Sequence, residues 1–465
     1  MADNIKEEKL EFRGGMFGLL VPFIIMLGGI LILSVGGRAL PMAFWVPALA
    51  GIFSALVLAK DRAKCADALI AGIANPTVIM IVVVLFFAGI VANIMKTTGL
   101  VEGLTWLCSR IGVSGALFPL ITFLCGSLLS TATGTALGTV MSLAPVLYPV
   151  GVALGAYPPL MLGAIVSAAY FGDNIAPVSD TTIASAYTQD VAVPVVVRSR
   201  LKYAFAGAAI AAVLFVVTGF LFYSGPSGGT AVVETSPNGL IMLAVPALLI
   251  FMMVRGNHML SALTTASVVG LVIGIVSGQL NIADVLVINM DSFTVSGTLV
   301  DGINGMMDTV VFAMLLMALV HLLEVGGVFQ VLLDKVSGFT DTPKKAELVI
   351  AAADIILNIL TVCNSVVILM EGPLARHLLT EKHGITPDRS ANILDAVSCV
   401  AMCLIPYGFA PMLAYTFAAG SGAPVNFSMN MVVLFSFHGI GLGIVMLFSI
   451  LSGWGRTFVD KEKRS

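Results

Sequence analysis

The sequence predicts an all-α protein that crosses the membrane many times. Of its 465 residues, 58% are hydrophobic and only 11% are charged, whereas a soluble globular protein carries about 25% charged residues. Stretches of about 20 or more residues without a charged side chain recur, and each could cross the ~30 Å hydrocarbon core of a bilayer as a helix. These stretches are residues 14–37, 39–59, 68–95, 203–233 and 396–455.

The lengths of the apolar stretches, and the polar residues that separate them, together predict about ten full spans. We expect them at residues 16–35, 40–59, 77–96, 157–172, 203–223, 239–254, 259–277, 309–324, 391–408 and 431–451. Two further regions, 114–154 and 346–379, each carry a polar break, at 130–135 and 361–365. Each region is either a re-entrant hairpin followed by a span or two spans with a loosened centre, and the sequence leaves both open.

Lys and Arg residues set the expected orientation, because cytoplasmic loops are enriched in them. Basic loops alternate with connections that contain neither residue, such as 277–308. Both termini are therefore expected in the cytoplasm. The protein is expected in a plasma membrane, most simply a bacterial inner membrane. The expected order is a cytoplasmic tail at 1–15, a transmembrane repeat at 16–223, an extracellular linker at 224–238, a second, inverted repeat at 239–451 and a basic cytoplasmic tail at 452–465.

The two halves of the chain resemble one another. Residues 87–104 and 316–332 are both spans that end in glycine before an amphipathic segment, the two polar breaks follow in the same order, and 173–177 matches 407–411. Because the first unit begins inside and the second outside, the repeats are expected to be inverted. Secondary transporters of this construction bind their substrate near the midplane, between broken helices.

Residues 172–182, Gly-Asp-Asn-Ile-Ala-Pro-Val-Ser-Asp-Thr-Thr, are the strongest functional signal, because 111–171 contain no Asp, Glu, Lys, Arg or His. A charge at the bilayer centre costs at least ~2.5–3.5 kcal/mol, so carboxylates at that depth indicate an ion pathway. Pro177 cannot donate a backbone hydrogen bond, which would free the carbonyl of Asp173 to bind a cation. The expected ion-binding residues are Asp173, Asn174, Ser179, Asp180, Thr181 and Thr182, with Asp173 and Asp180 as the sodium ligands.

A carboxyl group at that depth suits an exchanger. Burial away from water favours its neutral form, so the group could hold either a proton or a sodium ion. Competition between the two ions for one site is a sufficient physical basis for exchange. The alternative is that the hydroxyls of Ser179 and Thr182 only form hydrogen bonds with backbone groups that the helix break leaves free.

Other polar residues in apolar surroundings extend the candidate site. They come from the first break, from the second break and from the helix that follows it: Thr131, Thr133, Thr135, Asn364, Ser365 and Asp395, together with Glu371 and Tyr407. Asp395 competes with a role as an interfacial helix cap. Asp354 and Glu371 flank the second break.

The motif Ala-Tyr-Phe-Gly-Asp at 169–173, followed by Pro-Val-Ser-Asp-Thr-Thr at 177–182, resembles the signature of NhaC-type sodium/proton antiporters. The stretch 389–395 and the repeat plan are also similar. The resemblance implies an inverted-repeat carrier of the ion-transporter superfamily, an elevator-like mechanism with paired hairpins, and a homodimer. The sequence departs from the family at Asn174, where many members carry lysine. Relatives also include a malate/lactate exchanger.

Two functions follow from these observations. The first is a sodium/proton antiporter, and the alternative is a sodium- or proton-coupled carrier or exchanger of a small organic acid or amino acid. An organic anion needs a complementary cation near the midplane, and no Lys or Arg is expected there, which favours the first. The sequence has no Walker loop, Rossmann glycine set or His-Glu-x-x-His motif, so no enzyme and no cofactor beyond transported Na+ and H+ is expected. The expected partners are membrane lipid and these ions, and the lack of a basic stripe excludes nucleic acid.

Overall fold

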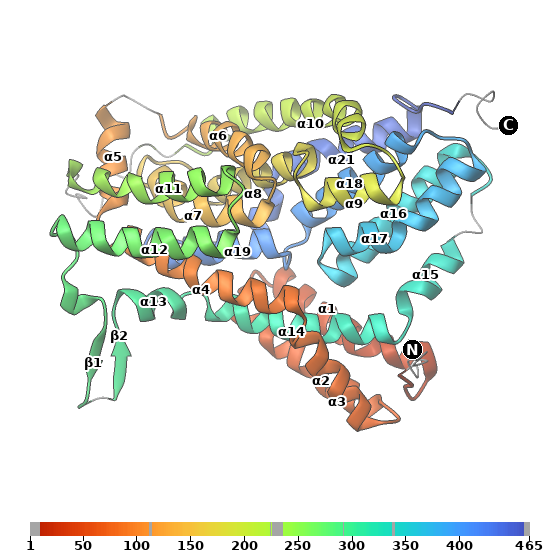
Figure 1. Ribbon diagram of the computed structural model, residues 1–465, viewed down its shortest axis with the longest axis horizontal. Coiled ribbons are helices and arrows are strands. Elements are labelled where there is room, and N and C mark those ends of the chain that lie inside the picture. Colours follow the sequence, from red (N-terminus) through yellow and green to blue (C-terminus); the bar gives the residue numbers. More distant parts are fainter. Residues whose placement is uncertain are drawn as a thin grey trace. The chain divides into compact units, whose positions relative to one another are not determined.

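The computed structural model describes residues 10–110, 114–223, 225, 236–291, 293–336 and 340–459. Within these residues the regular elements are many helices and one short antiparallel pair of strands, β1 (Val287–Asn289) and β2 (Thr294–Ser296). Nine of the described helical segments are long and apolar enough to cross a membrane, and three shorter apolar helices accompany them. The predicted class, an all-α polytopic membrane protein, is confirmed (Figure 1).

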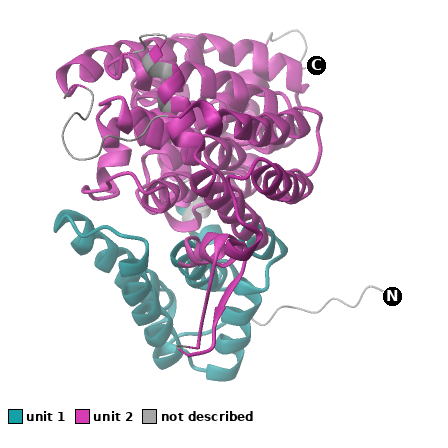
Figure 2. Ribbon diagram, turned by 90° about the vertical axis from the view of Figure 1, so that its left-hand side faces the viewer, with its two compact units in different colours: residues 1–82, 308–338 teal, residues 83–307, 339–465 magenta. Residues whose placement is uncertain are grey.

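The chain divides into two compact units, which Figure 2 distinguishes by colour. Unit 1 consists of residues 1–82 and 308–338. Its helices are α1 (Gly15–Val35), η1 (Met42–Phe44), α2 (Trp45–Leu58), α3 (Arg62–Ile73), the first turns of α4 (Pro76–Thr97), most of α14 (Met307–Val325) and α15 (Val328–Val336).

Within unit 1, α1 packs against α2, and the chain before α1 returns to the end of α2. Phe12 pairs with Ala59 through the backbone, and the ammonium of Lys60 lies 2.8 Å from the carboxylate of Glu11. The hydrogen bond from Lys60 and its positive charge lower the pKa of Glu11.

Unit 2 consists of residues 83–307 and 339–465 and contains every residue of the predicted site. Its first elements are α5 (Leu100–Arg110), α6 (Phe118–Thr133), α7 (Ala136–Ala153), α8 (Pro158–Ile175), α9 (Asp180–Thr188), α10 (Val193–Leu221), η2 (Pro237–Leu243), α11 (Ala244–Val254), α12 (Met259–Val276), η3 (Ile282–Asp284), β1, β2 and α13 (Thr298–Asn304). The later elements are α16 (Pro343–Thr361), α17 (Asn364–Ala375), η5 (Arg376–Lys382), α18 (Pro387–Leu404), α19 (Phe409–Gly420), α20 (Asn430–Leu434) and α21 (Phe437–Ser452).

The region 114–154 folds as a helical hairpin, formed by α6 and α7. Gly115, before α6, lies so close to Leu154, after α7, that a Cβ atom on it would be 2.1 Å from the Leu154 carbonyl oxygen. The two helices therefore run in opposite directions. The chain turns between them at Gly134, whose φ of 66° is left-handed, a conformation that glycine adopts without steric cost.

The second polar break also separates two helices, which pack against each other as a second hairpin. α16 ends at Thr361 and α17 begins at Asn364, and Val362 between them has a left-handed φ of 52°. This conformation is uncommon for a β-branched residue and tends to occur at functional sites. Val362 is fully buried, so the surrounding side chains hold it in place.

Helix α8 is the centre of unit 2 and packs against α6, α7, α10, α18 and α19. All of its residues after the first are buried. At Gly172 the backbones of α8 and α6 meet: a Cβ atom there would lie 2.3 Å from the carbonyl carbon of Ser130 and 2.3 Å from the amide nitrogen of Thr131. The contact is with backbone, which cannot move aside as a flexible side chain can.

Replacing Gly172 with alanine should therefore destabilise the fold by about 1–3 kcal/mol, the usual cost of overpacking a core. Gly28→Ala is the matched control, because Gly28 is inside α1 and an added Cβ would meet nothing within 4 Å. That change should be neutral or stabilising, since alanine is the better helix former. Thermal unfolding of the detergent-solubilised protein measures both. A Gly172→Ala variant as stable as the Gly28→Ala variant would contradict the close α6–α8 contact.

The predicted match between residues 173–177 and 407–411 is wrong in register. In the first half α8 ends at Ile175 and α9 begins at Asp180, whereas in the second half α18 ends at Leu404 and α19 begins at Phe409. The proline within the second break is therefore Pro406. Pro411 is the third residue of α19, in the first turn, where the missing N–H has no intrahelical partner to lose.

Candidate functional site

The predicted break at Pro177 is present, and both hairpins reach it. Pro177 lies between α8 and α9, in a turn closed by the Ser179 amide, which donates to the Ala176 carbonyl at 3.2 Å. The tip of the first hairpin lies against this turn: a Cβ atom on Gly134 would be 3.0 Å from the Ser179 amide nitrogen. The start of α17 also arrives here, through Asn364. Segments far apart in the sequence thus meet at one broken helix.

Asp173 is a buried carboxyl group that only neutral groups contact. It is in the last turn of α8 and is 3% exposed. The Ser179 hydroxyl donates to its Oδ1 at 2.8 Å and the Asn364 amide to its Oδ2 at 3.4 Å. No Lys or Arg of the described residues forms an ion pair with it. The neighbouring charges are those of Asp180 and Asp395, and both are negative.

Asp395 has the opposite environment, because Arg200 forms an ion pair with it and neither side chain is exposed. Arg200 comes from α10 and Asp395 from α18. The Asp395 carboxylate also accepts from the hydroxyl of Thr182 at 3.2 Å and from the amide of Asn174 at 3.4 Å. This carboxylate is therefore neutralised by a fixed partner, whereas that of Asp173 is not.

Arg200 is the residue of this cluster that sequence reasoning missed: no Lys or Arg is expected centrally in a span, and Arg200, in the first third of the 29-residue helix α10, is fully buried beside the break. Each nitrogen of its guanidinium group already has an acceptor. The acceptors are the Asn392 side-chain oxygen for Nε (3.0 Å), the Ser185 hydroxyl for Nη2 (3.2 Å), and for Nη1 the Asn174 carbonyl (2.5 Å), the Thr182 hydroxyl (3.0 Å) and Asp395. The group ties α8, α9 and α18 to α10.

The error has a physical cause and a signal that could have prevented it. Residues 198–202 read as a basic loop, but α10 begins ten residues before the expected span and includes them. The buried positions Val196, Arg200, Tyr203 and Gly207 recur at three- and four-residue spacing, which is one face of a helix. Arg198 lies off this face and is exposed.

Of the remaining predicted residues of α9 and α17, some contact the groups around Asp173 and others are exposed to solvent. The Thr181 hydroxyl is 2.9 Å from that of Ser179 and so joins the Asp173 cluster. Asp180 is exposed, and its carboxylate accepts from the Ser365 hydroxyl. Asp173 in α8 and Asp180 in α9 thus flank the break, but only Asp173 is buried.

The other predicted residues make local or separate contacts. Thr131 and Thr133 donate to carbonyl groups of their own helix, and Thr135 caps α7 by accepting from the Gly138 amide. Tyr407 donates to the Ile359 carbonyl at 2.8 Å. Glu371 is fully buried, and neither of its carboxyl oxygens has a hydrogen-bond partner among the described residues.

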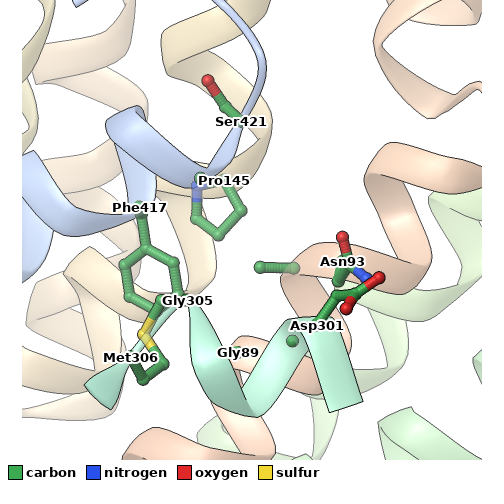
Figure 3. Close-up of a pocket in the computed structure, with 11 residues that line it drawn as sticks. Gly89, Asn93, Pro145, Asp301, Gly305, Met306, Phe417 and Ser421 are labelled. Atoms are coloured by element: carbon green, nitrogen blue, oxygen red, sulfur yellow. The ribbon is translucent and has the colours of Figure 1, made fainter. Parts of the chain in front are cut away.

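A small pocket in unit 2 is separate from this cluster. Figure 3 shows Asn93 and Asp301 on one side of it and Phe417 on another. The Asn93 amide is held by the Thr298 carbonyl at 2.9 Å. Its lining contains none of the predicted site residues.

A polytopic helical protein whose broken helices enclose a buried, uncompensated carboxyl group has the construction of a secondary transporter. Residues 14–220 match the model of the Na+/H+ antiporter family. The resemblance seen in the motifs is therefore confirmed, and it is carried by the part of the chain that contains Asp173 and Arg200.

Three curated relatives are antiporters by name. The chain is 30% identical over 233 residues to the malate-2H+/Na+-lactate antiporter of Bacillus subtilis, a match that covers 47% of this chain and 50% of the relative. It is 24% identical to the Na+/H+ antiporter NhaC of Alkalihalophilus pseudofirmus, over 77% of this chain and 82% of the relative. It is 25% identical to the arginine/ornithine antiporter ArcD of Halobacterium salinarum, over 94% and 92%.

Only half of the Bacillus relative's length is matched, whereas the other two matches extend over most of each chain. All three names describe antiporters, in agreement with the predicted class of protein. The names differ in whether an ion alone or an organic solute is exchanged.

Proposed function

We propose that the protein is a sodium/proton antiporter in which the Asp173 carboxyl group holds Na+ and H+ in alternation. The observation that carries this proposal is the contrast between two buried carboxyl groups. Arg200 neutralises Asp395, whereas the described residues give Asp173 only the neutral donors Ser179 and Asn364. An ionised carboxylate in such a place requires a cation, and a protonated one does not.

The groups around Asp173 are suited to a hard cation, which takes oxygen ligands. The proposed ligands are the Asp173 carboxylate, the hydroxyls of Ser179 and Thr181, and the side-chain oxygen of Asn364. Asp180, exposed beside Ser365, would attract the ion to the break and hand it to Asp173. The family match and the named Na+/H+ antiporter among the relatives support this assignment.

Exchange follows from charge balance. One negative charge is neutralised by one sodium ion or one proton, and binding of either removes the reason to bind the other. The Arg200–Asp395 pair neutralises itself, so Asp173 is the group of this cluster whose charge has to change during the cycle. Alternating access to the two sides of the membrane, through movement of the paired hairpins, completes the proposed cycle.

Exchange of an organic acid or amino acid, as named for two of the relatives, is the other candidate. Arg200 is the cation that such a substrate would require, but each of its nitrogens already has an acceptor and its charge is balanced by Asp395. An organic anion would have to displace these contacts. The geometry therefore favours an ion as the substrate at this site.

The remaining assignments extend the same proposal. The two halves are inverted repeats, 16–223 and 239–451, joined by an extracellular linker. The protein lies in a bacterial inner membrane with both termini in the cytoplasm, and it forms a homodimer. The family resemblance and the alternation of basic loops along the chain support these assignments.

Reconstitution in liposomes that contain a pH-sensitive dye tests the proposed function. Addition of sodium alone outside the liposomes should move protons out of the lumen, which the dye reports as a rise in luminal pH. Addition of lithium or potassium instead of sodium measures the ion selectivity. A panel of organic acids and amino acids is then added. If sodium moves no protons while an organic solute does, the protein is an organic-solute exchanger and the proposal is wrong.

A further inference from the structure

A second pair of buried carboxyl groups lies apart from Asp173, in the second hairpin. Asp354 in α16 and Glu371 in α17 are both fully buried, and α16, α17 and α18 pack against one another. Asp354 is seven residues before the last residue of α16, and Glu371 is seven residues after the first residue of α17, so the packing of the two helices places both residues at the same depth of the hairpin. Asp354 also acts on Glu371 electrostatically. The pair therefore shares one enclosed, low-dielectric place.

The hydrogen bonds of the pair are unequal. The Asp354 carboxylate accepts from the Asn358 amide at 2.8 Å and from the Ser398 hydroxyl at 3.2 Å. Both carboxyl oxygens of Glu371 are buried without a partner among the described residues, and so is the side-chain oxygen of Asn358. Oxygen acceptors are therefore present in excess, and the missing element is a hydrogen-bond donor.

No cationic side chain of the part of the chain that the structure describes supplies that donor. The elements that pack on the pair carry charged groups, but each has another partner or faces water: Arg389 with Glu347, Arg200 with Asp395, Arg376 with Asp190 and Glu381, Lys382 with Thr340, exposed His377 beside Glu381, and exposed Asp180 with Ser365. Asp395 also acts electrostatically on Asp354, but its negative charge is balanced by the positive charge of Arg200.

The pair is closed off from the side of α9. The Thr188 side chain lies so close to Gly372 that a Cβ atom there would be 2.4 Å from the Thr188 Cβ. The Gln189 amide donates to the Gly372 carbonyl at 2.9 Å and accepts from Ser390 at 2.8 Å. Two ionised carboxylates cannot share such a place, because each disfavours the charge of the other.

We propose that Asp354 and Glu371 form a second proton-binding site, which holds one proton between them and exchanges it during each transport cycle. The proton converts one acceptor oxygen into the missing donor and leaves the pair with a single negative charge, toward which the Asn358 and Ser398 donors point. Such a pair takes up and releases its proton as a unit.

The location of the pair links it to the first site. Asn364, which contacts Asp173, and Glu371 are both in α17 and are seven residues apart, which places them on the same face of the helix about 10 Å from one another. Asp395 acts electrostatically on both Asp173 and Asp354. A change of charge at one site is therefore felt at the other. This role in transport rests on the proposed antiport function, whereas the binding of the proton does not.

Infrared spectroscopy of the purified full-length protein tests the proton itself. At mildly alkaline pH, where exposed carboxyl groups are ionised, the wild-type protein should keep a band from a protonated carboxyl group, and Glu371→Gln should lose intensity in that band. Glu324→Gln, at an exposed position, is the matched control and should not. Isotope labelling of glutamate or of aspartate in the Asp173→Asn variant, which removes the protonatable carboxyl group of the first site, repeats the test without a substitution in the pair. If no protonated band persists, or if neither label shifts it, the second site does not exist.

Proteoliposomes test whether this proton moves. The pH difference that halts net flux against a fixed sodium gradient gives the number of protons exchanged per sodium ion. We expect Glu371→Gln to exchange one proton fewer per sodium ion than the wild type, whereas Glu324→Gln should match the wild type. An unchanged ratio in Glu371→Gln would show that the proton stays in place and would overturn the transport role. If the wild-type protein exchanges no sodium for protons, the proposed function fails, and the infrared result still decides on the site.

Discussion

Replacing Asp173 with asparagine should abolish sodium-driven proton movement and leave membrane insertion intact. The variant keeps the size of the side chain and an acceptor oxygen for the Ser179 hydroxyl, but it removes a buried negative charge that no cationic side chain of the described residues neutralises. Loss of a buried charge partner costs about 3–5 kcal/mol, which corresponds to sodium binding at least about a hundredfold weaker. Sodium-dependent dye signals in proteoliposomes measure the effect.

Two further variants define what the Asp173→Asn result means. Asp67→Asn makes the same chemical change at an exposed position in α3 and should transport as the wild type does. Asp180→Asn removes the exposed carboxylate at the same break and should raise the sodium concentration needed for half-maximal exchange without ending it. Undiminished exchange in Asp173→Asn would remove this residue from the ion pathway.

Replacing Arg200 with glutamine should have the largest effect on stability. It leaves the Asp395 carboxylate buried without its counter-ion, and breaking a buried ion pair in this way costs about 3–5 kcal/mol. Arg200 also joins α8, α9, α10 and α18 through its other hydrogen bonds, so the loss affects the packing around the break. Thermal unfolding in detergent should show a clear decrease in midpoint.

The double variant Arg200→Gln with Asp395→Asn separates charge from packing. Removing both charges avoids the unpaired carboxylate, so the double variant should be more stable than Arg200→Gln alone. Arg198→Gln, two residues away on an exposed face, is the matched control and should unfold as the wild type does. If Arg200→Gln is as stable as this control, the ion pair has no structural role.

Much of the fold follows from sequence because lipid constrains it strongly. The uncharged runs predicted the spans at α1, α2, α4, α12 and α14 within a few residues of their observed ends, since a helix is the simplest way to satisfy the backbone in a bilayer. The broken helix at Pro177 was also predictable, because a proline and carboxylates so deep in an apolar region are stable only where the helix is interrupted beside a polar site.

The elements that sequence reasoning missed depend on tertiary contacts. Arg200 reads as one more residue of a basic loop until α18 places Asp395 beside it. Pro411 reads as a helix break, although its place in the first turn of α19 makes it a helix beginning. In both cases the local sequence pattern is compatible with two structures, and only the tertiary structure around the residue shows which of them forms.

The most direct measurement of the central claim is the number of protons released when sodium binds to the purified protein. Isothermal titration with sodium chloride, repeated in buffers of different ionisation enthalpy, yields that number. If Asp173 holds either ion but not both, sodium binding should release protons from the wild-type protein, weaken as the pH falls, and be lost in Asp173→Asn. Sodium binding without proton release, or with unchanged affinity in Asp173→Asn, would contradict the account.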